Sequence, residues 1–360
     1  MNEISNKIAF WYDKNQRDLP WRHTRDPYLI WLSETILQQT RVAQGWDYYL
    51  RFVEHYPTVQ DLAAASEDEV LKLWQGLGYY SRARNLHTAA MQVTGDESLD
   101  GFPSEYARLI KLKGVGPYTA AAIASIAADE EVAVVDGNVY RVLSRLFDLA
   151  TPIDTGQGQR QFMALATELL PHRAEGGSPG HHNQAMMELG ALCCTPTSPK
   201  CQDCPVAEHC LALANGTVAE RPVKSTKVKV RERHLLYIIY IYKEGMWVHQ
   251  RGAGDIWQGL WEPYSIEIEQ KEERETLFPP TPLLDIIQPQ LIMEKKHQLT
   301  HQTINAQFWV CQLTNDDQSE QLNRALEPKG YRWVSWDDWQ GMAVPRLIDE
   351  VNRKLSSDWF

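Results

Sequence analysis

The spacing of hydrophobic and polar residues changes once along this chain, near residue 214. From residue 5 to about residue 213, apolar side chains recur at intervals of three and four, which predicts amphipathic helices. In one such run, the capping box of Ser66 and Glu69 precedes four apolar positions on one helical face, Val70, Leu73, Trp74 and Leu77. Alternation with a period of two is scarce here, so the pattern predicts an all-α domain over residues 1–214.

The remainder of the chain predicts a linker and a second domain. Residues 215–233, "NGTVAERPVKSTKVKVRER", are polar and basic, contain proline and show no helical face, which is typical of an interdomain linker. The stretches "HLLYIIYIY" and "QFWVCQL" are rich in β-branched and aromatic residues and predict strands, whereas "MAVPRLIDEVNRKL" predicts a closing helix. We therefore expect a multidomain protein whose residues 234–360 form an α+β domain.

Charge and composition narrow the classes of function. The 360 residues carry a formal net charge of −11, which argues against a general binder of polyanions. Residues 1–225 contain 20 Lys and Arg against 27 Asp and Glu, so any binding of nucleic acid must use local donors and helix ends. The sequence shows neither an apolar run long enough for a bilayer nor a secretory signal, so we expect a cytoplasmic protein that does not bind membranes.

A group of cysteines near residue 200 predicts a metal centre. Four of them follow the spacing C-x6-C-x2-C-x5-C, namely Cys194, Cys201, Cys204 and Cys210. In a cytoplasmic chain, such crowding favours a metal site over disulfides. Structural zinc usually takes paired C-x2-C segments and this run has a single pair, so the spacing favours a [4Fe–4S] cluster over the zinc alternative. Cys193 does not fit this spacing and is interpreted as a buried residue next to the ligand Cys194, not as a ligand itself.

A glycine turn between two helical runs predicts a site for the DNA backbone. In "LIKLKGVGPYTAAAIASIA", Gly114 and Gly116 separate an apolar helix from an Ala-rich one, although a plain helix–helix turn would use the same residues. Amides that open the second helix can hold a phosphate, and Lys111 and Lys113 add positive charge. This helix-hairpin-helix arrangement, with a bound monovalent cation, can contact DNA without a basic patch and without reading its sequence.

Two carboxylates stand in apolar surroundings. Glu34 lies in the helical run "WLSETILQQT", where an ionised carboxylate is costly if it is buried. Asp136 stands where the apolar run "VAVV" passes into a helix, and from position alone a helix N-cap is its simpler explanation. A capping residue can also act in catalysis, so both roles stay open for Asp136.

Together, the hairpin, Asp136 and the cysteine spacing resemble the endonuclease III superfamily of DNA base-excision glycosylases. More narrowly, "LPWR", "RDPYLIWLSETILQQTRV", "LWQGLGYYSRARNL" and "VVDGNVYRVLSR" are similar to the adenine DNA glycosylase (MutY) family, over nearly all of residues 10–212. The stretch "GMWVHQRGAGDIWQGLWEPYSIE" is similar to the Nudix-like C-terminal domain of that family. The resemblance implies an all-α helix-hairpin-helix glycosylase domain with an iron–sulfur loop, joined to an α+β Nudix-like domain that recognises the lesion.

The resemblance also implies a reaction, which is hydrolysis of the N-glycosidic bond of adenine mispaired with 8-oxoguanine or guanine in double-stranded DNA. The family's acid/base glutamate matches Glu34, whose apolar setting would keep it protonated near neutral pH. The family's aspartate that stabilises the sugar cation matches Asp136, and Asn138 is placed to orient it or a water. Bifunctional members of the superfamily carry a Schiff-base lysine where this chain has Tyr118, so we expect a monofunctional enzyme that leaves an abasic site.

Further contacts with DNA follow from the same match. The residues that would line the adenine pocket are Trp21, Arg22, Leu37 and Gln184. The residues that would fill the vacated stack and contact the opposite base are Gln38, Thr40, Leu77 and Tyr79. From spacing alone, a core role for Leu77 and a packing role for Tyr79 are the alternatives. The family commonly senses 8-oxoguanine with a Phe-Ser-His loop, and the corresponding residues, which lose the aromatic ring, are Leu299, Thr300 and His301.

The second domain departs from a hydrolase pattern. A Nudix hydrolase carries a glutamate-rich box, G-x5-E-x7-R-E-x2-E-E, that binds magnesium, and the segment after Gly259 lacks this box. We therefore expect the domain to bind rather than to hydrolyse, which counts against a hydrolase of oxidised nucleoside triphosphates. Two alternatives to a monomeric adenine glycosylase are a glycosylase for oxidised pyrimidines, which Tyr118 disfavours, and a non-catalytic DNA-scanning module, which intact Glu34 and Asp136 disfavour.

Overall fold

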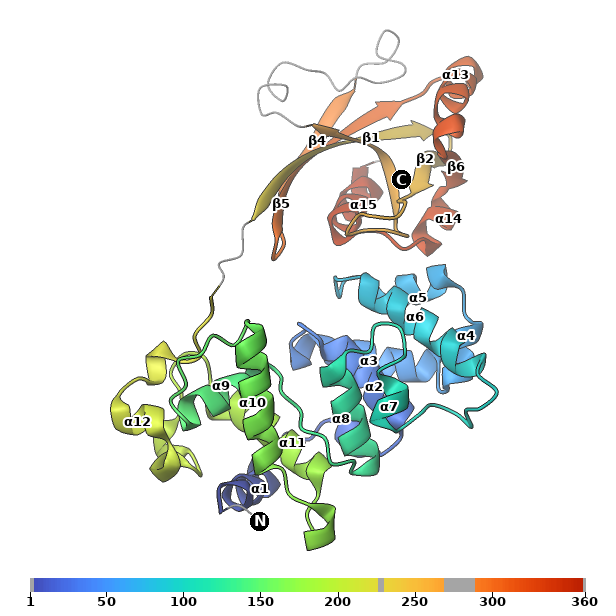
Figure 1. Cartoon of the computed structure of the whole chain (residues 1–360). Helices are drawn as coiled ribbons and strands as arrows, with labels where there is room; N and C mark the ends of the chain where they lie inside the picture. The colour runs from blue at the N-terminus through green and yellow to red at the C-terminus, as the bar shows by residue number, and fades with distance from the viewer. Residues whose placement is uncertain (1–2, 226–229, 269–288, 359–360) are drawn as a thin grey trace. The chain divides into compact units, whose positions relative to one another are not determined.

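The computed structural model of this chain describes residues 3–225, 230–268 and 289–358, and it divides into two units (Figure 1). One unit, the helical domain, comprises Met1–Ala64 and Asn85–Lys227, and the other, the C-terminal unit, comprises Ala65–Arg84 and Val228–Phe360. This division differs from the predicted one, which kept residues 65–84 in the helical domain. Side chains of residues 65–84, among them Lys72 and Gln75, make hydrogen bonds to C-terminal residues, and no sequence pattern marks these contacts.

The helical domain is all-α, as the sequence predicts. Its helices are α1 (Glu3–Asn15), α2 (Pro27–Leu37), α3 (Val42–His55), α4 (Val59–Ala64), α6 (Ser81–Thr94, which begins in the C-terminal unit), α7 (Tyr106–Leu109), α8 (Pro117–Ala128), α9 (Gly137–Leu146), α10 (Gly156–Leu169), α11 (Pro179–Leu192) and α12 (Leu211–Asn215). Short 3-10 helices are η1 (Pro20–Arg22), η2 (Arg173–Glu175), η3 (Cys201–Asp203), η4 (Ala207–His209) and η5 (Val218–Glu220). A core of buried side chains joins α1, α9, α10 and α11, and it includes Ile8, Leu143, Phe162 and Leu189.

Local signals explain where the two helices at the centre of this domain begin. Helix α2 begins at Pro27 after the N-cap Asp26, whose side chain accepts a hydrogen bond from the Tyr28 amide at 2.8 Å. Helix α8 begins at Pro117, directly after the hairpin residue Gly116. The buried, Ala-rich face of α8 allows close approach, and α8 packs against both α2 and α11 (Figure 1). Side chains on α2 and α8 are therefore able to meet.

The C-terminal unit is an α+β fold around a mixed sheet, which confirms the prediction. Among the residues described, the strand order is β4-β5-β1-β3-β2-β6, with β1 and β5 parallel and the other neighbours antiparallel. The strands are β1 (Arg231–Tyr242), β2 (Gly245–Gln250), β3 (Trp261–Ile268), β4 (Gln290–Gln298), β5 (Gln302–Gln312) and β6 (Arg332–Ser335). The helices that flank the sheet in Figure 1 are α13 (Asp316–Leu326), α14 (Trp336–Gly341) and α15 (Arg346–Asp358), and η7 (Glu327–Lys329) follows α13.

Strand β1 begins inside the predicted linker. Its first residues, Arg231 and Glu232, pair with Gln302 and Thr303 of β5 in the parallel ladder. Backbone pairing of this kind tolerates exposed polar side chains at a strand end, so the polar composition of residues 215–233 did not mark where the strand starts.

Residues 65–84 contribute helix α5 (Glu67–Trp74) to the C-terminal unit. The helix begins with the predicted capping box, because the Glu69 amide donates to Ser66 Oγ at 3.3 Å and the Ser66 amide donates to Glu69 Oε2 at 2.7 Å. It ends before Gly76 and Gly78, which have φ of 99° and 74°. These left-handed conformations favour glycine and produce a tight turn towards Tyr79.

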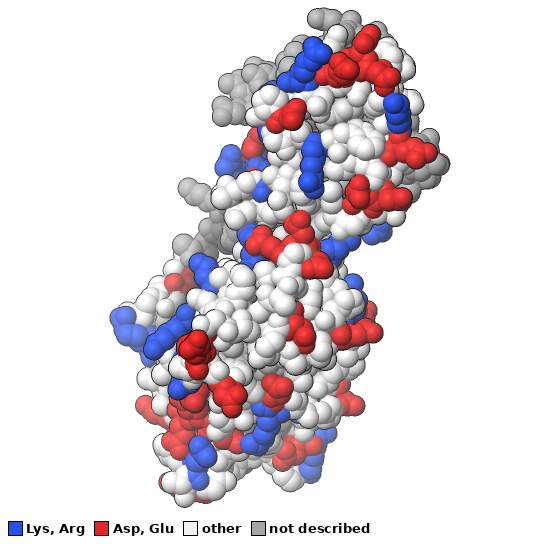
Figure 2. All heavy atoms as spheres, turned by 90° about the vertical axis from the view of Figure 1, so that its right-hand side faces the viewer, with Lys and Arg blue, Asp and Glu red and all other residues white. Residues whose placement is uncertain are grey.

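On one face of the molecule, positive and negative side chains are mixed rather than concentrated (Figure 2). On the face that Figure 2 shows, Lys and Arg side chains lie among Asp and Glu side chains in both units. This pattern agrees with the net charge of −11, so any contact with a polyanion would have to use local groups. Among residues 3–225, 230–268 and 289–358, every helix is too short or too polar to span a bilayer.

Candidate active site

Glu34 and Tyr118 meet inside the helical domain and form the centre of the candidate active site. Glu34 lies in α2 and Tyr118 in the first turn of α8, and the Tyr118 hydroxyl donates a hydrogen bond to Glu34 Oε2 at 2.6 Å. Burial raises the pKa of Glu34 to about 7, although the hydrogen bond from Tyr118 acts in the opposite direction. A carboxyl with such a pKa can hold a proton at neutral pH and release it, as a general acid must.

Asp136 is the N-cap of α9, so its capping role is confirmed. The Val139 amide donates to Asp136 Oδ1 at 2.8 Å, and Asn138 Nδ2 donates to Asp136 Oδ2 at 2.7 Å. Burial raises the pKa of Asp136, whereas these hydrogen bonds act to lower it. The charge of Asp136 in turn raises the pKa of Glu34, so the two carboxyls act on each other within one site.

Arg141, which the sequence interpretation does not include, connects Asp136 with the cysteine loop. Arg141 Nη2 donates to Asn138 Oδ1 and to Gly190 O, both at 2.8 Å, and its Nε donates to Cys194 O at 2.6 Å. A Cβ at Gly190 would lie 2.6 Å from the Cβ of Asn138, so the glycine lets α11 approach α9 closely. The spacing of Asn138 and Arg141 on one helical face was the signal that could have linked them.

A buried carboxylate that the sequence does not single out, Glu188 of α11, holds Arg22. Arg22 Nη1 and Nη2 donate to Glu188 Oε1 and Oε2 at 2.9 and 2.7 Å, and Arg17 Nε and Nη2 donate to the same oxygens at 2.9 and 2.6 Å. Glu188 is 1% exposed, and burial alone would raise its pKa. The hydrogen bonds from Arg17 and Arg22 lower the pKa of Glu188 to about 2, so it is ionised at neutral pH. The charge of Arg22 also lowers the pKa of Glu34, which places Arg22 near the acid.

The other residues predicted for the adenine pocket lie in the same domain. Trp21 is buried and packs edge-on against Tyr49, with ring centroids 5.2 Å apart. Gln184 Oε1, on α11, accepts a hydrogen bond from the Tyr12 hydroxyl at 3.4 Å. Leu37 is the last residue of α2, one turn after Glu34. Of the four residues predicted for this pocket, only Arg22 is described as acting on the Glu34 carboxyl, and it does so through its charge.

Gln38 and Thr40 follow α2 and lie beside the start of α8. Gln38 Nε2 donates to Thr119 Oγ1 at 3.1 Å, and Thr40 Oγ1 donates to Gln38 O at 3.4 Å. Gln38 thus contacts the residue that directly follows Tyr118, the hydrogen-bond partner of Glu34.

The residues predicted to recognise the base opposite adenine include Leu77, Tyr79 and the turn at Thr300, which lie in the C-terminal unit. Tyr79 and Thr300 share a hydrogen bond of 2.6 Å between their hydroxyls. Tyr79 is 44% exposed and has a φ of 48°, a conformation that is uncommon for tyrosine. Leu299 and His301 flank Thr300 in the turn between β4 and β5. Leu77 is 6% exposed, which favours the alternative that it packs in a core.

The glycine hairpin has the predicted form, with α7 before it and α8 after it. Gly114 has a φ of 76°, and a Cβ there would lie 2.6 Å from the Cβ of Asn85, so both conformation and space require glycine. Gly116 is the N-cap of α8, and Lys111 and Lys113 are exposed. The start of α8 is thus open to an anion from solvent.

The four spaced cysteines surround one space. They line a single cavity with Cys193 and Arg145, and all six cysteines of the chain are free thiols. Arg145 is buried, and its Nη1 donates to Cys194 Sγ at 3.4 Å and to Thr195 O at 2.8 Å. Four thiols around one space, with a cation beside one sulfur, fit an iron–sulfur cluster. Cys193 is buried and its thiol donates to Lys200 O at 3.3 Å, as expected of a neighbour.

Carboxylates near the position of a Nudix box are paired with arginine. Asp255 Oδ2 accepts hydrogen bonds from Arg251 Nη2 at 2.6 Å and from Arg233 Nη2 at 2.9 Å. The buried Glu262 accepts from Arg251 Nη1 at 2.5 Å and from Ser265 Oγ at 2.7 Å. Carboxylates held in this way are poor candidates for magnesium ligands. Much of the segment where the box would lie falls within residues 269–288, which are outside the residues that the structure describes.

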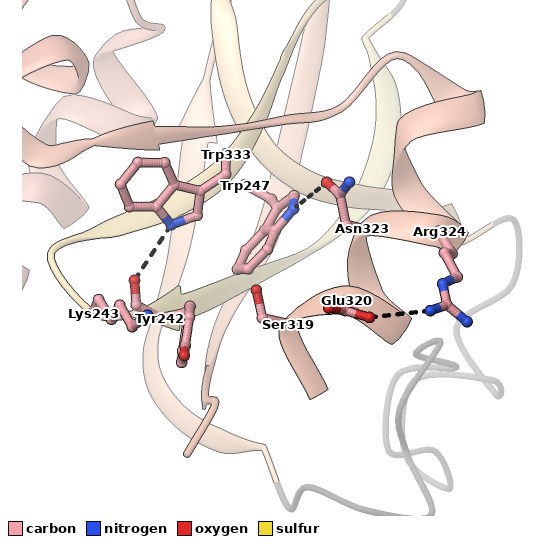
Figure 3. Close-up of a pocket in the computed structure, with 8 residues that line it drawn as sticks. All are labelled: Tyr242, Lys243, Trp247, Ser319, Glu320, Asn323, Arg324 and Trp333. Atoms are coloured by element: carbon pink, nitrogen blue, oxygen red, sulfur yellow. Dashed lines mark hydrogen bonds and ion pairs between the residues drawn. The ribbon is translucent and has the colours of Figure 1, made fainter. Parts of the chain in front are cut away.

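A separate cavity of about 470 Å³ lies in the same unit, between the β1–β2 turn and α13 (Figure 3). Its lining residues are Tyr242, Lys243, Trp247, Ser319, Glu320, Asn323, Arg324 and Trp333. Its two cations form ion pairs, Lys243 with Asp316 at 3.0 Å and Arg324 with Glu320 at 3.1 Å. The cavity contains none of the predicted site residues.

Comparisons with known proteins show which class of protein this chain belongs to. Residues 32–171 match the HhH-GPD superfamily base excision DNA repair protein, residues 194–210 match the iron–sulfur binding domain of endonuclease III, and residues 236–354 match a NUDIX domain. A thermostable thymine-DNA glycosylase of known structure is 30% identical with a TM-score of 0.53, over 59% of this chain and 95% of that one. A non-covalent endonuclease III–DNA complex, at 22% identity and a TM-score of 0.50 over 59% of this chain and 94% of that one, shares the fold. These matches define a helix-hairpin-helix DNA glycosylase of base-excision repair.

Curated relatives identify the family within this class. The mouse adenine DNA glycosylase is 33% identical over 408 residues, which cover 97% of this chain and 77% of the mouse protein. The adenine DNA glycosylase of Arabidopsis thaliana is 40% identical over 263 residues, which cover 64% of this chain and 41% of the plant protein. The chain belongs to the adenine DNA glycosylase (MutY) family.

Proposed function

We propose that the protein is a monofunctional adenine DNA glycosylase, which hydrolyses the N-glycosidic bond of adenine opposite 8-oxoguanine or guanine and leaves an abasic site. The observation that carries this proposal is the pair of Tyr118 and Glu34, joined at 2.6 Å, in which burial raises the pKa of the carboxyl to about 7. Adenine is a poor leaving group unless it is protonated. An acid that is still protonated near neutral pH can supply that proton.

Asp136 is the group that we assign to stabilising the oxocarbenium-like sugar as the bond breaks. Its two oxygens accept hydrogen bonds from the Val139 amide and from Asn138, so the carboxylate is oriented before the cation develops. Asn138 is itself oriented by Arg141 at 2.8 Å. Glu34 has one described neutral donor and Asp136 has two, which favours Glu34 as the acid and Asp136 as the charged partner.

The base must leave the duplex to reach these groups. We assign the walls of its pocket to the four residues matched to the family, Trp21, Arg22, Leu37 and Gln184. Tyr118 has no amine that could form a Schiff base with the sugar, which supports hydrolysis without strand cleavage.

Recognition of the base opposite adenine is assigned to Tyr79 and the turn between β4 and β5. The hydrogen bond between Tyr79 and Thr300 supports this assignment, because it joins two groups that the family match gave the same task. Leu299 and His301 flank Thr300, and Gln38 and Thr40 would contact the strand near the acid.

The cofactor is proposed to be a [4Fe–4S] cluster held by Cys194, Cys201, Cys204 and Cys210, whose role is to order the loop that follows α11. Gly114 and Gly116 would present backbone amides to a DNA phosphate, with a monovalent cation at the hairpin. The proposed partner is double-stranded DNA, bound by the protein as a monomer.

The deciding experiment is single-turnover cleavage of duplexes that hold adenine opposite 8-oxoguanine, adenine opposite guanine, or an oxidised pyrimidine (thymine glycol) opposite adenine, each with and without alkali. We expect strand breaks in both adenine duplexes only after alkali treatment. Breaks without alkali would indicate a lyase, and cleavage at thymine glycol would favour the glycosylase for oxidised pyrimidines. Binding without release of any base would favour the DNA-scanning module. A colourless, zinc-loaded protein from anaerobic preparation would overturn the cluster assignment.

A further inference from the structure

The segment Ala65–Arg84, here named the α5 segment, groups with the C-terminal residues although the chain continues from both of its ends into the helical domain. Hydrogen bonds to residues 250–349 involve the side chains of Asp68, Lys72, Gln75, Tyr79, Tyr80 and Arg84. Tyr79, the residue assigned to the base opposite adenine, thus lies on a segment that is attached at several points to the rest of the unit.

Lys72 binds the end of α14. The last carbonyls of a helix have no partner within it, and Lys72 Nζ donates to Gln340 O at 2.6 Å and to Met342 O at 2.9 Å. A cation at this end is also favourable for the helix dipole. Burial lowers the pKa of Lys72, and the charge of Asp349 raises it, so Lys72 and Asp349 also attract each other.

Gln75 binds the start of α15 with both ends of its amide. Gln75 Oε1 accepts a hydrogen bond from the Val344 amide at 3.1 Å, and Gln75 Nε2 donates one to Asp349 Oδ1 at 3.2 Å. A glutamate at this position would have the same shape, but it would lose the donor and place a second negative charge against Asp349.

Space that is not filled by side chains lies beside the hydrogen bonds of Lys72 and Gln75. A cavity of about 370 Å³ remains beside Lys72 and Gln75, and Trp336, Trp339 and Val344 also line it. Unfilled space contributes no packing energy, so packing at this cavity does not replace these hydrogen bonds when they are lost.

Helix α15, which Gln75 contacts, also contacts the strand that leads to Thr300. Glu350, the neighbour of Asp349 in α15, pairs with Lys295 of β4 at 2.7 Å, and α15 packs against β4. Strand β4 ends at Gln298, just before the turn that carries Thr300. On the other side, the tight turn after Gln75 leads directly to Tyr79. A change at Gln75 can therefore alter both partners of the Tyr79–Thr300 contact.

We propose that Lys72 and Gln75 are positioning residues for recognition of the base opposite adenine, because they hold the α14–α15 region on the α5 segment and so keep Thr300 within reach of Tyr79. This inference rests on the proposed function, in which that contact discriminates 8-oxoguanine from guanine. Neither residue needs to touch DNA for this role.

The test compares Gln75→Glu, Lys72→Met and the double variant with Gln159→Glu, which makes the same change on an exposed site of α10. Single-turnover release of adenine is measured opposite 8-oxoguanine and opposite guanine. We expect the ratio of the two rates to fall about tenfold in the double variant, as loss of a few hydrogen bonds would cause. The rate opposite guanine should stay unchanged, and Gln159→Glu should behave as the wild type.

A second readout is backbone hydrogen exchange of residues 298–302 and of α15 in the full-length protein, which should be faster in the double variant and unchanged in Gln159→Glu. An unchanged rate ratio, or an equal fall of both rates, overturns the proposal. If the wild type shows no preference for 8-oxoguanine, the proposed lesion recognition fails on its own, and hydrogen exchange then decides the attachment. Unchanged exchange in the double variant would overturn that part as well.

Discussion

Replacing Tyr118 with phenylalanine is the most direct perturbation of the Glu34 site, because it removes one hydroxyl and keeps the ring. The hydroxyl donates to Glu34 Oε2 at 2.6 Å, and this hydrogen bond lowers the pKa of Glu34 against the larger rise caused by burial. A hydrogen bond to a charged group contributes about 1.5–3 kcal/mol, which is about one to two pKa units. Its loss should therefore raise the pKa of Glu34 from about 7 to about 8 or 9.

The assay is the single-turnover rate of adenine release, with enzyme in excess, over roughly pH 5 to 9. Because the protonated form of Glu34 is the proposed acid, the wild-type rate should fall as the pH rises through about 7. In Tyr118→Phe the fall should occur at higher pH, whatever happens to the plateau at low pH. The direction of this pKa shift follows from the hydrogen bond. A phenol that donates to a carboxylate favours the ionised form of the carboxyl, so removing the phenol favours the protonated form of Glu34.

Met187→Leu is the matched control, because Met187 Sδ is the other described contact of the Tyr118 hydroxyl, at 3.7 Å. This variant keeps the bond to Glu34, so the midpoint of its pH profile should match that of the wild type. A midpoint in Tyr118→Phe that stays in place or moves to lower pH would refute the reasoning, since the phenol would then not stabilise the ionised carboxylate.

Three further variants test other parts of the site. Glu34→Gln should abolish adenine release and yet melt at a higher temperature than the wild type at alkaline pH. The rise of the Glu34 pKa from 4.5 to about 7 corresponds to about 3 kcal/mol of stability that is present below pH 4.5 and lost as the pH rises through 7, so equal melting at pH 8 would contradict it. Arg141→Gln should slow adenine release because Asn138 loses its donor at 2.8 Å, and the iron content should stay unchanged. Loss of iron without slower release would show that Arg141 stabilises only the cysteine loop. Cys204→Ser should lower the iron content below the about four irons expected per chain, and an unchanged content would exclude Cys204 as a ligand.

Parts of the site that depend on local sequence could be predicted. Glu34 lies in an apolar helix, so desolvation alone predicted a raised pKa, and the capping positions of Ser66 and Asp136 were readable from residue type and spacing. The partner of Glu34 was harder to find, because Tyr118 is separated from it by 84 residues. That contact depends on how α8 packs on α2, which periodicity does not specify.

Features built from distant polar residues could not be predicted. Glu188 is one carboxylate in an otherwise ordinary helix, and nothing in its neighbourhood reveals that Arg17 and Arg22 converge on it from 171 and 166 residues away. The α5 segment reads as part of a continuous helical domain because its apolar positions have helical spacing. Its grouping with the C-terminal residues depends on polar groups such as Gln75 and on backbone carbonyls, which leave no periodic signal.

Glu188 explains how the partly buried Glu34 can lie near an arginine and still hold its proton at neutral pH. The charge of Arg22 lowers the pKa of Glu34, but Arg22 donates from both terminal nitrogens to Glu188, whose pKa of about 2 keeps it ionised and able to offset that charge. In Glu188→Gln the charge of Arg22 would lose this counterion, the pKa of Glu34 should fall, and the rate of adenine release should decline at lower pH than in the wild type. Tyr118→Phe and Glu188→Gln should therefore move the midpoint in opposite directions. A shift of both variants in the same direction would mean that the titrating group in the pH profile is not Glu34.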